Sequence, residues 1–298
     1  MTWTRALLML LILLSVGSVR QASDRRLPCI EAALVQPDLI EGVAVFTAFD
    51  GTREARAGWI SSKDGDSVLD MASLTKPLVA ADVRRRIFAG TLDLDQSIKT
   101  LLPTATVAAE TAPISLQQLL QHRAGFDRSG GDPLFLPPPA SCRRAAEVVL
   151  GRPPEMAVGQ HVMYSNAGYC VLGEIILRDP SGTDASLMRA IGSPLGAAGG
   201  WRGSLRQLHA SLSNTLPLTE LPAEPALPDG SHYAYGWRSW PDRQDGPRWS
   251  HYGRLSGLVS VAVTDGKQKL LVAHFWGDPH DGDAAGAAAA KALWRCME

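Results

Sequence analysis

The sequence has no marked excess of charge of one sign, and this limits the partners to be expected. Its 298 residues contain 29 Lys and Arg against 30 Asp and Glu, which gives a formal net charge of −1 at pH 7. Two short basic runs, Arg84–Arg86 and Arg143–Arg144, are typical of solvated faces. The charge balance therefore gives no indication of a nucleic acid or an acidic surface as partner.

Metal-binding and lipid-anchor patterns are absent as well. The cysteines show no Cys-x-x-Cys spacing and there is no His-Glu-x-x-His pattern, so we predict no metal site. No cysteine directly follows the N-terminal apolar run, which argues against a lipid anchor there. The four cysteines are Cys29, Cys142, Cys170 and Cys296. An even number permits disulfides in an exported protein, but the sequence alone leaves three pairings open.

The N-terminal apolar run is too short for a comfortable membrane span of roughly 20 residues. It extends from Ala6 to Leu14, follows Arg5 and is succeeded by small residues, which is typical of a secretory signal peptide cleaved after Ser18. The alternative is an uncleaved N-terminal anchor. We therefore expect a signal peptide at 1–18 and a periplasmic or secreted protein without a stable membrane partner.

The expected elements run in the order strands, helices, strands and a final helix. A β-hairpin is expected over Gly42–Ile60 with its turn at Asp50–Gly51, and a buried helix over Ser73–Phe88. Further helices are expected at Ile114–Leu120, Ala145–Leu150, Ala167–Leu177, Ser204–Leu212 and Ala284–Cys296, and strands at Tyr233–Trp240, Leu255–Thr264 and Lys269–Trp276. This order predicts an α+β fold, with helices packed on an antiparallel sheet and a helical lobe between its strands. The length suits one large domain or two lobes that share a site.

Ser73 and Lys76 form a Ser-x-x-Lys motif, which alone occurs often by chance. Positions i and i+3 share one helix face, so a helix that begins at Ser73 would bring the lysine amine to the serine hydroxyl. A serine hydroxyl becomes an effective nucleophile when a neighbouring base takes its proton, and a helix N-terminus favours developing negative charge. The alternatives are a helix N-cap for Ser73 and a surface position for Lys76.

Two further segments, Tyr164-Ser165-Asn166 and His251-Tyr252-Gly253, follow in order. With Ser-x-x-Lys they resemble the serine β-lactamase and penicillin-binding-protein superfamily, and more closely its branch of class C β-lactamases, D-Ala-D-Ala carboxypeptidases and related esterases. Other segments that fit this branch are Met71–Pro77, Gly90–Asp95, Leu119–Gly125, Tyr169–Ile176, Pro194–Gly196 and Tyr235–Trp237.

The resemblance covers the chain from about Gly42 to Trp276 and implies a β-lactamase-like fold. In that fold an antiparallel sheet is flanked by N- and C-terminal helices and carries an inserted helical lobe. We expect one domain over 24–298, with a sheet lobe at about 24–70 and 200–298 and a helical lobe at about 71–199. Because the first and last helices pack side by side in this fold, the resemblance favours pairing Cys29 with Cys296, which leaves Cys142 for Cys170.

The resemblance implies a role for each motif residue. Ser73 would be the acyl-accepting nucleophile, Lys76 would take its proton, and Tyr164 would be a second acid or base. Asn166 would bind the lysine or the acyl side of the substrate. The alternatives are a half-buried aromatic for Tyr164 and a cap of the following helix for Asn166.

The last motif stands just before the strand expected at Leu255–Thr264, and the resemblance places it beside the substrate. Gly253 would let the substrate lie close to that strand, and the Arg254 N–H would join that of Ser73 as an oxyanion hole. His251 would orient Tyr164 or polarise the substrate, and its alternative is a structural histidine. Every step can be done by side chains and water, so no cofactor is expected.

Departures from the family pattern bear on the substrate. His251 stands where β-lactamases have the lysine of Lys-Thr-Gly. A histidine at this position is characteristic of the esterase-like members. Tyr252 occupies the place of a Thr or Ser that helps to bind the carboxylate of β-lactams. The stretch after Pro194–Gly196 is also shorter than in relatives, which predicts a more open pocket.

These features predict an exported serine hydrolase that forms an acyl-enzyme on a small-molecule ester or amide, with a carboxylic ester favoured. The alternatives are a D-amino-acid peptidase or carboxypeptidase, a weak β-lactamase and, from a different class, a non-catalytic penicillin- or peptidoglycan-binding module. The sequence gives no indication of the oligomeric state.

Overall fold

The computed structural model describes residues 24–48, 51–58, 63–127, 131–221 and 226–298. The signal peptide expected at 1–18 lies outside these residues, as do Asp50 and Trp59–Ile60 of the predicted hairpin. No helix in the described ranges is long and apolar enough to cross a membrane.

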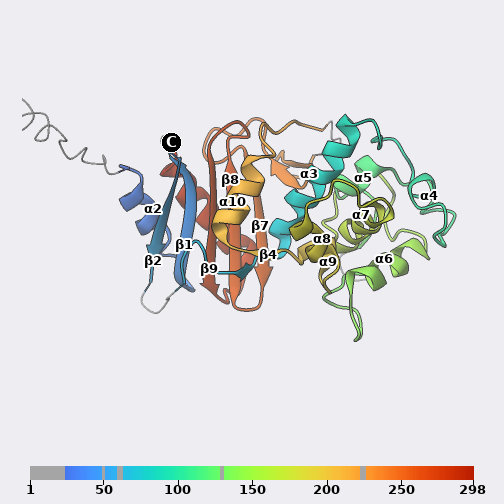
Figure 1. The fold of residues 1–298 in the computed structure, drawn as a ribbon, viewed down its shortest axis with the longest axis horizontal. Helices are drawn as coiled ribbons and strands as arrows, with labels where there is room; N and C mark the ends of the chain where they lie inside the picture. Colours follow the sequence, from blue (N-terminus) through green and yellow to red (C-terminus); the bar gives the residue numbers. More distant parts are fainter. Residues whose placement is uncertain (1–23, 49–50, 59–62, 128–130, 222–225) are drawn as a thin grey trace, which may run out of the picture.

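An antiparallel sheet of seven strands forms one half of the molecule (Figure 1). Its order is β2-β1-β9-β8-β7-β6-β5. The strands are β1 Leu39–Ala48, β2 Gly51–Ala57, β5 His232–Ala234, β6 Trp237–Ser239, β7 Trp249–Leu255, β8 Leu258–Thr264 and β9 Leu270–Gly277. A separate pair, β3 Leu69–Asp70 with β4 Arg202–Gly203, lies where the chain passes between the sheet and the helical half. The predicted α+β class with an antiparallel sheet is confirmed.

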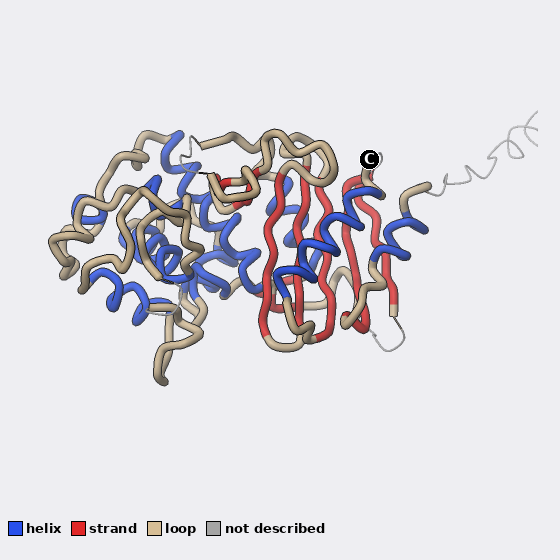
Figure 2. The backbone as a smooth tube through the Cα atoms, turned by 180° about the vertical axis from the view of Figure 1, so that it is seen from behind, coloured by secondary structure: helices blue, strands red, loops and turns tan. Residues whose placement is uncertain are grey.

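Helices cover both faces of the sheet. Helices α2 Leu27–Ala33 and α11 Gly282–Arg295 lie on one face (Figure 2), and α10 Leu205–Ser213 lies on the other. The helical half contains the 3-10 turn η1 Ala72–Leu74 and the helices α3 Thr75–Phe88, α4 Ile98–Leu101, α5 Leu116–Leu120, α6 Cys142–Leu150, α7 Asn166–Arg178, α8 Ala185–Ile191 and α9 Gly196–Gly199. Disulfides join Cys29 to Cys296 and Cys142 to Cys170, which confirms the pairing that the resemblance favoured.

The alternation of side chains along each strand builds two separate cores. On β1, Val43 and Val45 pack with the helical half and α10, whereas Ala44 and Phe46 pack with α2 and α11. The register carries this alternation across to β7, where His251 pairs with Ala262 of the first core. His251 and Gly253 therefore face the helical half, and the residues between and after them face α11.

Several predicted boundaries are wrong around the third motif. The single strand predicted over Tyr233–Trp240 is a hairpin of β5 and β6, because Tyr235 and Gly236 adopt left-handed φ angles of 46° and 80° and turn the chain. His251-Tyr252-Gly253 lies inside β7 rather than before a strand, and the next strand begins at Leu258 rather than Leu255. Polar residues interrupt the apolar pattern of β7, which hid the strand.

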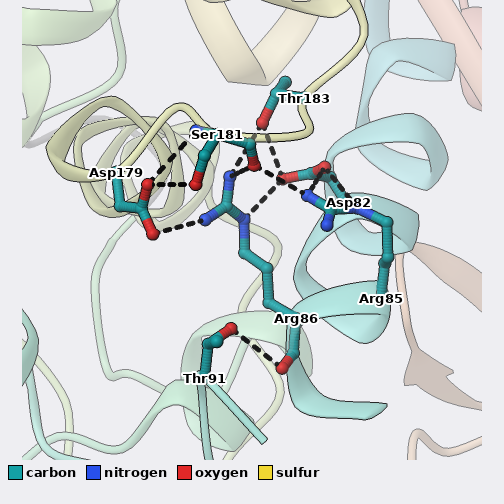
Figure 3. A network of polar contacts seen from close by, with 7 residues as sticks. All are labelled: Asp82, Arg85, Arg86, Thr91, Asp179, Ser181 and Thr183. Atoms are coloured by element: carbon teal, nitrogen blue, oxygen red, sulfur yellow. Dashed lines mark hydrogen bonds and ion pairs between the residues drawn. The ribbon is translucent and has the colours of Figure 1, made fainter. Parts of the chain in front are cut away.

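A polar network fixes the far end of α3 to the loop after α7 (Figure 3). The Arg86 guanidinium donates to the Asp82 carboxylate at 2.8 Å and to Thr183 Oγ1 at 2.8 Å, and Arg85 donates to the same carboxylate at 2.9 Å. Arg86 is only 5% exposed, so the solvated face expected for Arg84–Arg86 is wrong at this position. The network anchors the helix whose first turn carries Lys76.

Candidate active site

Ser73 lies in η1, a tight turn wedged between β7 and the start of α3, and not at the first position of the helix as the sequence predicted. The preceding residue, Ala72, has a φ of 47°, a conformation that is strained for a residue with a Cβ. Buried hydrogen bonds hold this turn: Ser260 Oγ donates to Met71 O at 3.0 Å, and Thr75 Oγ1 donates to Ala72 O at 2.8 Å. Ser73 is thus presented to a pocket of about 330 Å³.

Lys76 is fully buried and aimed at Ser73. Its Nζ contacts Ser73 Oγ at 3.1 Å, Asn166 Oδ1 at 2.7 Å and the Ala198 carbonyl oxygen at 2.6 Å. The last two atoms can only accept, so each takes one N–H of the amine. Ser73 Oγ lies within hydrogen-bond distance of the same nitrogen. The surface position considered for this lysine is therefore wrong.

Asn166 is held by a carboxylate that the sequence did not reveal. Its Nδ2 donates to Asp132 Oδ2 at 2.7 Å, which fixes Oδ1 toward Lys76. Asp132 is 1% exposed, and its Oδ1 accepts the Leu134 N–H at 2.8 Å. The cap of α7 is Ser165, whose side chain accepts from the Gly168 N–H, so the capping alternative for Asn166 is wrong. Asp132 lies in a Gly/Pro-rich loop without a local signal of function.

Tyr164 stands just before α7 in a cluster of aromatic rings. Its ring centroid is 4.5 Å from that of His122, 5.9 Å from Tyr233 and 6.2 Å from His251, and Lys76 Nζ lies 4.9 Å from it. Burial raises the pKa of Tyr233, on β5, to about 12. Tyr233 lines the pocket beside Tyr164, and the sequence analysis missed it.

His251 faces the same pocket from β7 and stays uncharged. Burial, together with the charges of Lys76 and Arg238, lowers its pKa well below the ordinary value. Its Nε2 is buried without a hydrogen-bond partner among the described residues. Strand β6 pairs with β7 only at Trp249 and Ser250, so the edge of β7 from His251 onward is open toward the pocket.

The remaining residues of the third motif divide between the two faces of β7. A Cβ on Gly253 would lie 2.5 Å from Met71 O and 3.1 Å from Ala72 Cβ, so only glycine lets the strand approach the Ser73 turn this closely. Tyr252 turns the other way, with its ring against Gly286 of α11, and forms part of the pocket wall. Arg254 also lines the pocket, and its side chain packs over Gly282.

The outer end of the pocket carries charges of both signs. Arg238 pairs with Asp229 at 2.6 Å, and the guanidinium groups of Arg238 and Arg243 lie 4.9 and 4.8 Å from the Trp240 ring. Asp283, on the first turn of α11, lines the same end. In the described part of the chain, no group of three or more His, Cys, Asp or Glu residues could hold a metal ion.

Comparison with known proteins identifies the family. A family model named Beta-lactamase matches residues 30–206, more than half of the chain. The chain belongs to the beta-lactamase family. The match includes the Ser-x-x-Lys and Tyr-Ser-Asn segments, and this family consists of serine hydrolases. The predicted superfamily and the prediction of a hydrolase are thereby confirmed.

Solved structures of the same fold extend over nearly the whole chain. The structure of SurE with D-Leu has a TM-score of 0.70 and 22% identity, covering 92% of this chain and 75% of SurE. A D-stereospecific amidohydrolase from Streptomyces has a TM-score of 0.67 and 19% identity, covering 92% and 98%. A D-amino acid amidase from Ochrobactrum anthropi has a TM-score of 0.69 and 17% identity, covering 91% and 97%. These similarities show a common fold.

Among curated proteins, a probable fimbrial assembly protein FimD of Dichelobacter nodosus is 37% identical over 112 residues. A second FimD sequence from the same organism is 34% identical over 115 residues. These matches cover 35% of this chain and 27% of each relative, so the chain spans about a quarter of the length of these two curated relatives.

Proposed function

We propose that this protein is an exported hydrolase that forms an acyl-enzyme on Ser73 and cleaves a small carboxylic ester. The observation that carries the proposal is the buried amine of Lys76, which is held by Asn166 and Ala198 and lies 3.1 Å from Ser73 Oγ. A neutral amine held this way presents its lone pair to the hydroxyl proton. The nucleophile then attacks the ester carbonyl, and the Ser73 and Arg254 N–H groups would stabilise the oxyanion.

Tyr164 would complete the proton transfer. In the acylation step the proton from Ser73 passes to Lys76 and on to the leaving alkoxide through Tyr164, and in deacylation the same groups activate a water molecule. The Lys76 amine, 4.9 Å from the tyrosine ring centroid, supplies a nearby positive charge once it is protonated.

The ester preference rests on His251. An imidazole with a lowered pKa is neutral at pH 7, so this position of β7 lacks the fixed positive charge that a lysine would offer to a substrate carboxylate. An ester needs no such charge. A D-amino-acid amide is the second candidate, because Asp283 lines the outer pocket and a carboxylate suits an α-ammonium group.

The test compares three substrates on the purified protein: p-nitrophenyl acetate, D-phenylalanine amide and a chromogenic cephalosporin, each with Ser73→Ala as control. We expect Ser73-dependent turnover of the ester to exceed that of the cephalosporin by at least tenfold. Faster amide turnover would support the second candidate, and cephalosporin turnover would make this a β-lactamase. Stable acylation without turnover would indicate the binding module. N-terminal sequencing of protein recovered from the bacterial periplasm tests export and cleavage after Ser18.

A further inference from the structure

His122 occupies a backbone position at which glycine is usual. Helix α5 ends with the His122 N–H bonded to Leu119 O at 3.2 Å and the Arg123 N–H bonded to Gln118 O at 2.8 Å, the pattern of a Schellman motif. The residue at this point of the motif adopts the left-handed conformation, and His122 has a φ of 56°. A side chain here costs backbone energy that glycine would avoid, so the imidazole calls for an explanation.

The explanation lies in the contacts that His122 makes with both neighbours of Tyr164. Its carbonyl oxygen accepts the Met163 N–H at 2.8 Å, and its Nδ1 accepts the Ser165 N–H at 3.1 Å. The left-handed conformation directs the carbonyl to one side while the side chain reaches the other. One residue thus holds the backbone on both sides of Tyr164.

The imidazole also packs against the Tyr164 side chain. The two ring centroids lie 4.5 Å apart, and the rings of Tyr169 and Tyr233 close the imidazole in at 5.0 and 4.7 Å. His122 is 2% exposed, so this arrangement has little freedom to shift. Because Nδ1 accepts a hydrogen bond, a neutral imidazole carries its proton on Nε2.

The imidazole is held in that neutral form. Burial lowers the pKa of His122 well below its ordinary value, and a positive charge on Lys76 acts in the same direction. A protonated ring would lose the Ser165 hydrogen bond, since Nδ1 would become a donor facing a donor. The contacts on Tyr164 are therefore present throughout the neutral pH range.

We propose that His122 is a positioning residue, which fixes the backbone and ring of Tyr164 so that the phenol reaches Ser73 and Lys76. This inference rests on the proposed function, in which Tyr164 transfers the proton. His122 itself touches no reacting atom, so its loss should lower kcat and leave KM nearly unchanged.

The test uses two substitutions that both tolerate a left-handed backbone. His122→Gly removes the acceptor and the ring, whereas His122→Asn retains an acceptor oxygen near the place of Nδ1. For p-nitrophenyl acetate we expect His122→Gly to lower kcat at least tenfold with KM within twofold. His122→Asn should recover at least a third of the wild-type kcat. His209→Asn, which removes another buried imidazole on α10, is the matched control and should leave kcat within twofold.

Thermal unfolding identifies the folded variants. A folded His122→Gly with wild-type kcat, or a His122→Asn as slow as His122→Gly, would overturn the positioning role while the proposed function stands. Wild-type protein without Ser73-dependent hydrolysis of any ester or amide would overturn the proposed function, and the role of His122 with it.

Discussion

Replacement of Asp132 by asparagine should impair catalysis without unfolding the protein. The Asp132 carboxylate accepts the buried Asn166 amide N–H at 2.7 Å and the part-buried backbone N–H of Leu134 at 2.8 Å. An asparagine at this position has one acceptor oxygen, so its amide nitrogen must face one of these donors. When that nitrogen faces Asn166 Nδ2, the Asn166 amide, which contacts Lys76 Nζ at 2.7 Å, loses its fixed orientation.

The magnitude follows from leaving one buried donor without an acceptor, which costs about 1–3 kcal/mol. If that cost falls on the transition state, about 1.4 kcal/mol per tenfold gives a decrease of roughly 5- to 150-fold in kcat/KM. The decrease should appear mainly in kcat, because Asp132 does not touch the substrate pocket directly. The assay is hydrolysis of p-nitrophenyl acetate, with thermal unfolding measured on the same preparation.

Asp82→Asn is the matched control, since Asp82 is also a buried acid in a polar network but lies in the middle of α3, outside the Ser73 pocket (Figure 3). It should lower the melting temperature, because it breaks the pair with buried Arg86, and it should leave kcat/KM within about twofold. The reasoning is refuted if folded Asp132→Asn keeps its kcat/KM within twofold, or if Asp82→Asn loses as much activity.

Three further predictions concern stability and the Ser73 turn. In the chain-entropy model, removing the Cys29–Cys296 disulfide, which spans 267 residues, should cost about 5.6 kcal/mol, against about 3.6 kcal/mol for Cys142–Cys170 over 28 residues. Urea unfolding of the two double serine variants measures both losses, and a larger loss for the shorter loop would contradict the entropic argument. Burial lowers the pKa of His274 to about 4 from an unfolded value near 6.5, so between these pH values the native state binds fewer protons than the unfolded state. The free energy of unfolding should therefore fall as the pH decreases from about 6.5 to 4. His274→Gln should flatten the dependence of melting temperature on pH, and an unchanged slope would rule this histidine out as a cause. Gly253→Ala would place a Cβ against Ser260 Oγ and 2.5 Å from Met71 O, so kcat should fall more than tenfold. The control Ser256→Ala, in the exposed turn between β7 and β8, should match the wild-type kcat. Equal activity of the two variants would show that the Ser73 turn tolerates displacement.

The elements that the sequence predicted well are those with a strong local signal. Segments that are apolar nearly all round indicate the buried helices α3 and α7, and the Asp265–Gly266 turn marks the β8–β9 hairpin. The helices α4, α8 and α9 have 4, 7 and 4 residues, which is too short for a periodic signal. Strand β7 escaped detection because its functional residues replaced the alternating apolar ones.

The sequence by itself determined the chemical groups of the candidate site: a serine and a lysine three residues apart, a Tyr-Ser-Asn segment, and a histidine with a glycine two residues later. Local spacing is enough to recognise these groups, because each motif lies on a single turn or strand. Only the tertiary structure decided how they meet. Lys76 reaches Asn166 across 90 residues and Ala198 across 122, and Asn166 reaches Asp132 across 34. Such hydrogen bonds depend on where the packed cores place each segment, and no local pattern encodes that placement. Only the tertiary structure therefore revealed the positions of Asp132 and Tyr233 and the contacts of His122 with Tyr164 and its neighbours.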